Sequence, residues 1–319
     1  MRHSPVFAFV VCLSLCGCDT RQSAPSDSAA VDHAKSVTTS EAVSGLEKTT
    51  QADLPLVQWA KPGLAPLFIN SDEDREQGIG DQMFVQIQSE MPQFRHMNLF
   101  SNYARLLEEM RKGSDLCAIL HKTPKREEFM VFSEPVVITP SYQLYISQKG
   151  MPRFIEKTGW DGNPIAFDDL LSRSRGLSLA VTPGQSYGVE RDTIIERHLD
   201  KIELIRSFAD HEALIKMLAA ERMDMVLGFP WVVNYRLEKL DIRKDLVKIP
   251  LNDVAAFETA YIACSDTPVG RRVVDAVNAI SPPVHDRAKS FLTRWLTAEE
   301  SIAYYRVYHD FFIESVPLP

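Results

Sequence analysis

The residues best suited to chemistry lie in one short basic loop, His121-Lys122-Thr123-Pro124-Lys125-Arg126. Thr123 and Arg126 both offer hydrogen-bond donors, and the planar guanidinium group of Arg126 fits a carboxylate or another oxyanion. His121 and Lys122 flank this pair and could add charge or specificity. The alternative interpretation is a solvated basic loop on an ordinary α/β protein.

The loop directly follows an apolar run of strand length, Leu116–Leu120. Upstream, apolar runs at Leu54–Trp59 and Phe94–Leu99 alternate with segments of helical periodicity that begin near Asp81 and Asn102. This order predicts a β-α-β-α-β unit, in which a parallel sheet is covered on both faces by helices. Because ligands of open α/β sheets bind at the carboxyl ends of the strands, we expect the basic loop to lie at a binding site.

The loop and the residues after it resemble a known family. Thr123-x-x-Arg126, followed by Phe132-Ser133-x-Pro135, is similar to the first-lobe signature of type 2 periplasmic solute-binding proteins of ABC importers, in family 3 with the polar amino-acid binders. The resemblance implies that Thr123 and Arg126 hold the carboxylate of a ligand and that Pro135 leads into a hinge between lobes. Strings at residues 78–81, 122–126 and 264–267 also resemble a lipoprotein subgroup of this family.

The resemblance also implies the architecture. It is an α/β fold of two lobes, each a mainly parallel sheet covered by helices, with two strands crossing between them. Lobe 1 is expected at residues 54–138 and 257–319, and lobe 2 at residues 139–256. The sequence favours two similar halves, because Asp224–Leu227 follows a helical segment just as Asp115–Ala118 does.

A turn in the expected lobe 2 supplies further candidate ligand-binding residues. Thr182–Gly188 opens a helix, and small residues in such a turn leave backbone N–H groups free to meet an oxygen of a ligand. The turn resembles the one with which the second lobe of the family grips its ligand, and it contains Gln185, Ser186 and Tyr187. An ordinary helix-capping turn is the alternative.

Three aromatic residues, Trp59, Phe229 and Trp231, are expected to form apolar walls of the site. In the amino-acid binders an acidic residue takes the ligand's ammonium group where this chain has Gly228-Phe229-Pro230. A buried ammonium group without a carboxylate is costly, so an ordinary α-amino acid is not the expected ligand. An apolar, cyclic or planar group fits better. The alternative is that Phe229 and Trp231 simply fill the core.

The N-terminus predicts export. Arg2 and His3 precede the apolar run Val6–Leu15, which is too short to span a membrane and is typical of a signal peptide at residues 1–17. The following Leu15-Cys16-Gly17-Cys18 resembles a bacterial lipobox, in which Cys18 carries the lipid. A plain signal peptide or a short buried helix is the alternative. Residues 18–53 contain no aromatic residue and predict a flexible tether that reaches on the order of 30 Å.

Composition limits the class of protein. The apolar fraction is 45% and the charged fraction 24%, as in an ordinary soluble domain. A net charge of −8 without a basic stripe argues against nucleic-acid binding. After export two cysteines remain, Cys117 and Cys264, and in an oxidising compartment they can form one disulfide; two separate buried thiols are the alternative. No cysteine or histidine spacing indicates a metal site, and no cofactor is expected.

The sequence therefore predicts a monomeric, lipid-anchored periplasmic protein that closes on a small ligand and passes it to a membrane permease. A periplasmic sensor that signals ligand occupancy to a membrane partner uses the same fold and is the first alternative. An enzyme is the second, and it is disfavoured because the sequence offers no nucleophile motif, metal spacing or persuasive carboxylate pair.

Overall fold

A computed structural model describes residues 53–70, 74–207, 211–242 and 245–314 of the chain. These ranges belong to one compact unit, Thr49–Pro319. The signal peptide expected at residues 1–17, the lipid attachment expected at Cys18 and the expected tether as far as residue 52 lie outside the described residues. None of the helices described is both long enough and apolar enough to cross a lipid bilayer.

The first sheet contains five strands in the order β2-β1-β3-β10-β4. The strands are β1 (Leu56–Pro62), β2 (Arg95–Ser101), β3 (Leu116–Leu120), β4 (Met130–Pro140) and β10 (Phe257–Ser265). β1 pairs in parallel with β2 and β3, whereas β10 is antiparallel to both β3 and β4. The sheet is therefore mixed, because the returning strand β10 enters it from the opposite direction. We call this sheet and its helices lobe 1.

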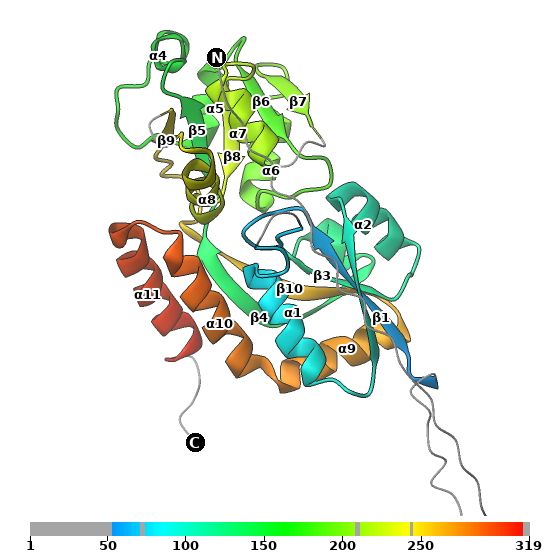
Figure 1. Ribbon diagram of the computed structural model, residues 1–319. Coiled ribbons are helices and arrows are strands. Elements are labelled where there is room, and N and C mark those ends of the chain that lie inside the picture. Colours follow the sequence, from blue (N-terminus) through cyan, green and yellow to red (C-terminus); the bar gives the residue numbers. More distant parts are fainter. Residues whose placement is uncertain (1–52, 71–73, 208–210, 243–244, 315–319) are drawn as a thin grey trace, which may run out of the picture. The chain divides into compact units, whose positions relative to one another are not determined.

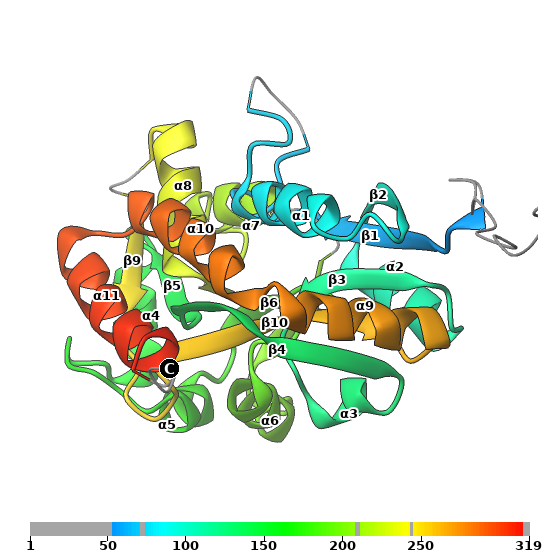
Figure 2. The same cartoon turned by 90° about the horizontal axis from the view of Figure 1, so that it is seen from below.

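The helices of lobe 1 surround this sheet (Figures 1 and 2). Figure 2 shows α9 and α10 following one another along the sheet. The helices are α1 (Ile79–Ser89), α2 (Tyr103–Arg111), α3 (Pro124–Glu127), α9 (Pro268–Ala279), α10 (Ser281–Arg294) and α11 (Ala298–Phe312). On α11 the aromatic side chains of Tyr304 and Tyr308 are buried.

The second sheet, which with its helices we call lobe 2, also has five strands, in the order β7-β6-β8-β5-β9. The strands are β5 (Gln143–Ser147), β6 (Ser178–Val181), β7 (Glu203–Arg206), β8 (Met225–Gly228) and β9 (Leu246–Ile249). The helices are α4 (Met151–Thr158), α5 (Phe167–Arg173), α6 (Val189–Arg197), α7 (His211–Ala219) and α8 (Pro230–Leu240). β5 is antiparallel to β8 and β9, so this sheet is mixed as well.

The chain crosses between the sheets twice, after β4 and before β10. The two crossings lie side by side, because the backbone N–H of Ser141 donates to the carbonyl oxygen of Ala256 at 2.9 Å. The two-lobed α/β fold expected from the sequence is confirmed. We call residues 141–142 and 250–256 the hinge.

Cys117 and Cys264 form a disulfide bond within lobe 1. They are register partners on the antiparallel strands β3 and β10, and both are buried. The bond therefore ties the returning strand to the strand that carries the basic loop.

Two helices have prolines in their first turn. The segment Phe229-Pro230-Trp231 was expected at a strand end, but Pro230 begins α8. The sequence predicts a break at Pro282-Pro283 before a helix at Ala288–Trp295, but both prolines fall in the first turn of α10, which begins at Ser281. The physical reason is the same in both cases: the first turn of a helix does not need the N–H group that proline lacks.

Candidate functional site

A small cavity of about 50 Å³ lies between the two lobes. From lobe 1 it is lined by the loop after β1, by α2, by the end of β3, by α3 and by the strands β4 and β10. From lobe 2 and the hinge it is lined by the turn before α6, by Tyr142 and by the start of α8. The lining residues are Leu64, Leu67, Tyr103, Ile119, Leu120, His121, Arg126, Val137, Thr139, Tyr142, Gln185, Ser186, Phe229, Trp231 and Ala260. We call it the inner cavity.

Arg126 connects the lobes through this cavity. It lies on the short helix α3 and is only 5% exposed. Its guanidinium donates to the carbonyl oxygen of His121 at 2.7 Å and to that of Gly184, in lobe 2, at 3.2 Å. Burial lowers the pKa of Arg126, and the neighbouring hydroxyls of Tyr103 and Tyr142 partly offset this effect. A guanidinium has more N–H donors than these two bonds use, so Arg126 can also hold an oxyanion.

Gly184 brings the backbones of the two lobes into close contact. Its φ of +81° is a conformation that side chains rarely adopt. A Cβ atom at this position would lie 2.8 Å from the backbone nitrogen of Ala104, at the start of α2. A glycine is therefore required both by the turn and by the approach of lobe 1.

A stack of aromatic rings fills the lobe 2 side of the cavity. The ring centroids of Tyr142 and Phe229 are 3.7 Å apart, and those of Phe229 and Trp231 are 5.4 Å apart. The His121 ring stacks on Phe229 from lobe 1 at 5.9 Å. The indole of Trp231 donates to the hydroxyl of Thr139 at 2.7 Å, which fixes the stack to β4. Planar apolar surface thus faces the guanidinium of Arg126.

The ring of His121 meets a buried ion pair beside the cavity. Arg191 of α6 donates to Glu258 of β10 at 2.6 Å, and the other carboxylate oxygen of Glu258 lies 3.5 Å from Nδ1 of His121. The same Nδ1 is 3.1 Å from the carbonyl oxygen of Thr259. Burial, reinforced by the positive charges of Arg126 and Arg191, lowers the pKa of His121 from 6.5 to about 4. His121 is therefore neutral at neutral pH.

The turn before α6 presents Gln185 and Ser186 to the cavity, and both are held by neighbours. The amide of Gln185 donates to the hydroxyl of Tyr142 at 2.7 Å. The hydroxyl of Ser186 donates to the carboxylate of Asp192 at 2.6 Å, and the backbone N–H of Tyr187 donates to the same carboxylate at 2.9 Å. Burial raises the pKa of Asp192. The turn is thus a rigid wall rather than a loose loop.

The structure brings together six of the ten expected ligand-binding residues. His121, Arg126, Gln185, Ser186, Phe229 and Trp231 line the inner cavity. Tyr187 is buried behind the wall, where its hydroxyl accepts from the N–H of Thr182 at 2.9 Å and burial raises its pKa to about 12.

The remaining three expected residues lie elsewhere. Trp59 is buried in lobe 1, where its ring centroid is 4.9 Å from that of Phe84 and its indole donates to His96 at 3.1 Å. Lys122 points outward and pairs with Glu127 at 3.0 Å. Thr123 is the N-cap residue of α3, half-buried and outside the lining of the inner cavity. Trp59, Lys122 and Thr123 are therefore not among the described residues that line the inner cavity.

Several residues of the site were not foreseen: Tyr103, Tyr142, Asp192, Arg191 and Glu258. Tyr103 begins α2, and its exposure to the cavity depends on how α2 meets lobe 2. Arg191 and Glu258 are 67 positions apart in the sequence. A Glu in the mostly apolar strand Phe257–Ser265 was a signal in the sequence that could have indicated the pair.

One group of side chains has the spacing of a metal site. The ligand atoms of His309, Asp310 and Glu314 lie within 4.8 Å of one another at the end of α11. All three side chains are exposed, as is common for surface charges, and they are not among the residues that line the inner cavity. They add nothing to the site between the lobes.

Solved structures identify the architecture. The periplasmic VFT2 domain of Bordetella pertussis BvgS has a TM-score of 0.54 at 20% identity, over 77% of this chain and 95% of that one. The substrate-binding protein AbpA of an amino-acid ABC transporter from Streptococcus pneumoniae, solved with L-arginine, has a TM-score of 0.57 at 15% identity, over 79% and 97%.

The chain has a type 2 periplasmic-binding-protein fold. A histidine kinase sensor domain with similarity to periplasmic binding proteins shares the same binding-protein fold, with a TM-score of 0.57 at 14% identity over 76% of this chain and 96% of that one. No protein-family model and no curated protein sequence matches the chain. At these identities the similarity establishes the binding-protein fold, and the function is argued from the site.

Proposed function

We propose that the protein is a solute-binding lipoprotein that closes around one small, carboxylate-bearing or polar ligand between its lobes and delivers it to an ABC-type importer. The observation that carries the proposal is the position of Arg126. A buried guanidinium lies between two lobes, between which the described chain crosses twice, and it already bonds to the backbone of the opposite lobe. The binding-protein fold shared with AbpA supports the same function.

The geometry indicates how binding proceeds. Rotation about the hinge separates Arg126 from the carbonyl oxygen of Gly184 and opens the aromatic stack to solvent. An oxyanion of the ligand then takes the place of that carbonyl oxygen at the guanidinium. Closure buries the ligand against Phe229 and Trp231, so that binding depends on both lobes.

The lining of the inner cavity favours a carboxylate without an α-ammonium group. Among the described residues that line it, there is a guanidinium but no carboxylate. The nearest acidic groups, Asp192 and Glu258, are engaged by Ser186 and Arg191. An ammonium group in this cavity would lack a charged partner, which is costly in a buried site.

The remainder of the proposal concerns the cellular setting. The signal peptide at residues 1–17, the lipid on Cys18 and the tether to residue 53 would hold a monomeric body at a bacterial membrane, facing the periplasm. The largely apolar lining of the cavity, in which Ser186 is held by Asp192 and Arg126 by backbone carbonyl oxygens, supports a binding role rather than an enzymatic one.

A thermal-shift screen of the full-length protein against keto acids, aromatic acids, amino acids and nucleosides tests the proposal. A ligand present at 100 times its dissociation constant should stabilise the protein by about 2.7 kcal/mol. Arg126→Gln should abolish the shift. Lys125→Gln, which changes the adjacent cation with 86% side-chain exposure, is the matched control and should retain it. An unchanged shift in the Arg126→Gln protein contradicts the proposal.

A sensor is the second candidate, because the binding-protein fold is shared with a histidine kinase sensor domain. Uptake of labelled ligand by cells with and without the gene separates the two functions. Loss of uptake supports transport, whereas unchanged uptake with an altered response to the ligand supports sensing.

A further inference from the structure

A larger cavity of about 390 Å³ adjoins the inner cavity at Tyr103, which lines both. It lies where the ends of β1 and β2 and the start of α2 face lobe 2. Its lining residues are Lys61, Gly63, Asn70, Phe100, Ser101, Asn102, Tyr103, Arg105, Thr182 and His211. We call it the outer cavity.

The charges of the outer cavity favour an anion. Arg105 is exposed on the first turn of α2, and no ion pair is formed by it among the described residues. Lys61 is buried, and its charge is already balanced by Asp81 at 2.9 Å and Glu76 at 3.6 Å. Arg105 is therefore the cation that remains available to a ligand. The amide and hydroxyl groups of Asn70, Ser101 and Thr182 add donors around it.

The linings of the inner and outer cavities differ from those of three other cavities in their acidic residues. Among the described residues, no carboxylate lines either the inner or the outer cavity. Carboxylates do line three other cavities: Asp74 and Glu238 in one, Glu190 and Glu258 in another, and Glu109 in a third, which Arg105 also borders. The inner and outer cavities, which share Tyr103, therefore each have an arginine in their lining, Arg126 and Arg105, and the described residues that line them include no acidic side chain.

The volumes of the two cavities indicate which part of a ligand each could hold. The inner cavity of about 50 Å³ is comparable with one or two water molecules, at about 30 Å³ each in the liquid. It suits a single carboxylate-sized group. The rest of the molecule must then extend past Tyr103 into the outer cavity.

We propose that the ligand is a compact dianion, with one oxyanion group at Arg126 and the second at Arg105. Short dicarboxylates and carboxylates that bear a phosphonate group share this chemistry. The inference rests on the proposed solute-binding function and specifies its ligand class. Arg105 would then determine specificity, because it distinguishes a dianion from a monoanion that binds at Arg126 alone.

Calorimetric titration of the full-length protein with matched anions tests the inference. The probes are succinate, glutarate and adipate, each beside its monoamide, and 3-phosphonopropionate for the phosphonate arm. We expect at least one dianion to bind about tenfold or more tightly than its monoamide, since a charge-assisted hydrogen bond is replaced by a neutral one. A higher salt concentration should reduce the difference in affinity between the dianion and its monoamide.

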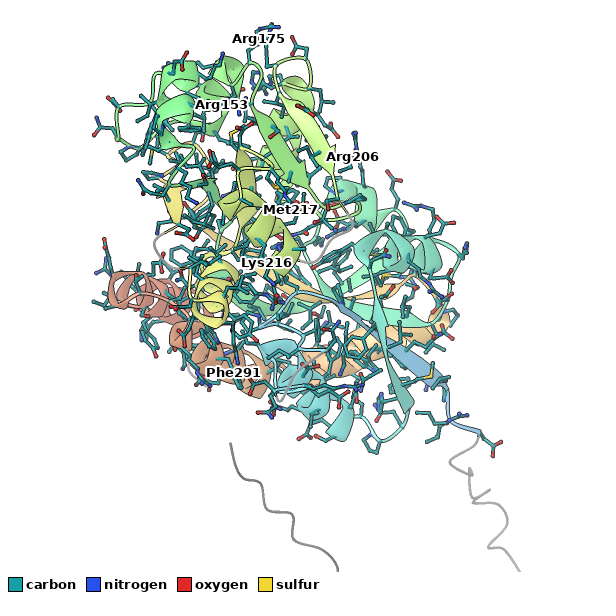
Figure 3. All side chains as sticks on the ribbon, turned by 45° about the horizontal axis from the view of Figure 1, so that its top comes forward. Arg153, Arg175, Arg206, Lys216, Met217 and Phe291 are labelled. Atoms are coloured by element: carbon teal, nitrogen blue, oxygen red, sulfur yellow. A yellow bond between two sulfur atoms is a disulfide. The ribbon has the colours of Figure 1, made fainter. Side chains whose placement is uncertain are left out.

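Variants of Arg105 and Arg175 test whether Arg105 causes the difference in affinity between a dianion and its monoamide. Arg105→Gln should reduce dianion affinity to that of the monoamide and leave the monoamide unchanged, and Arg105→Lys should restore part of the difference. Arg175→Gln is the control, because Arg175 is also exposed but lies at the end of lobe 2 far from lobe 1 (Figure 3).

The possible results distinguish the dianion inference from the proposed solute-binding function. Equal binding of dianions and monoamides, with no effect of Arg105→Gln, overturns the dianion inference and leaves the solute-binding function standing. Binding of neither class also overturns the inference, and the broader thermal-shift screen then decides the function.

Discussion

The guanidinium of Arg126 in lobe 1 is hydrogen-bonded to the backbone carbonyl oxygen of Gly184 in lobe 2. The residue that the sequence marks for an oxyanion therefore also fastens the two lobes together. Closure of the cleft and recognition of the ligand depend on the same side chain, so a change at either residue should affect both.

Gly184→Ala should weaken closure. The substitution places a side chain at a positive φ, which costs about 1–2 kcal/mol, and its Cβ atom would meet the backbone of Ala104. Gly176→Ala is the matched control, because its φ is +75° and nothing lies within 4 Å of the added atom.

Urea denaturation and small-angle scattering distinguish the two glycine variants. Both proteins should lose stability, but only Gly184→Ala should also enlarge the radius of gyration. Equal radii for the two variants would show that the backbone of lobe 1 does not constrain this turn.

Breaking the ion pair between Arg191 and Glu258 should be strongly destabilising. The Arg191 side chain is 2% exposed and that of Glu258 10%. Removing one partner leaves the other charge buried, which costs about 3–5 kcal/mol. We expect Arg191→Met and Glu258→Gln to reach this range singly, and the double variant to lose less than their sum. A strictly additive double variant in urea denaturation would contradict the pairing.

Stability should depend on His121 between pH 6.5 and pH 4. The folded protein keeps the pKa of His121 at about 4, below its ordinary value of 6.5. In this window the unfolded chain binds a proton that the folded protein does not bind, so the free energy of unfolding falls as the pH falls. The contribution is fully present above pH 6.5, and by pH 4 about 3 kcal/mol is lost.

His121→Gln should remove this dependence. The raised pKa values of Asp192 and Glu258 act in the opposite direction and are common to both proteins. The difference between the denaturation curves of wild type and variant, measured from pH 7 to pH 4, therefore isolates His121. Parallel curves would mean that His121 titrates normally in the folded protein.

Loss of the disulfide should destabilise lobe 1. Cys117 and Cys264 are 147 positions apart, and a cross-link across so long a loop restricts the unfolded chain strongly. The double variant Cys117→Ala and Cys264→Ala should lose about 2–5 kcal/mol in urea denaturation. Because both sulfur atoms are buried, a mild reductant should act on the wild-type protein only as it unfolds. Equal stability of the two proteins would contradict this prediction.

Local signals in the sequence predicted the α/β class, and the family resemblance supplied the two-lobed arrangement. The apolar run Leu116–Leu120 forms β3 with the expected bounds, and the alternation of strand and helix patterns defines both lobes. The helix at Pro230 was missed because Gly228-Phe229-Pro230 ends a strand and begins a helix at once. Local pattern alone does not distinguish such a junction from a loop.

The site could be predicted only in part, because half of it depends on contacts between distant segments. The family signature located Arg126, and turn chemistry located Ser186. Trp59 is aromatic and lies on β1, beside the strand that carries the basic loop, yet its side chain faces α1 rather than the cleft. Tyr142 lines the cavity because the hinge brings it against Phe229, 87 positions later by sequence numbers, and no local pattern encodes that encounter.

The paired crossings have a consequence for how the chain can be divided. Pro140 and Phe257 are register partners at the end of the β4–β10 ladder, so the chain leaves lobe 1 and re-enters it at neighbouring points. Removing residues 141–256 would leave two ends about 5 Å apart, a gap that a two-residue turn spans. Lobe 1 would become an uninterrupted domain with β4 and β10 as a hairpin and its disulfide intact. By this criterion lobe 2 is a module inserted into a host, and it could be exchanged without cutting any strand of that host.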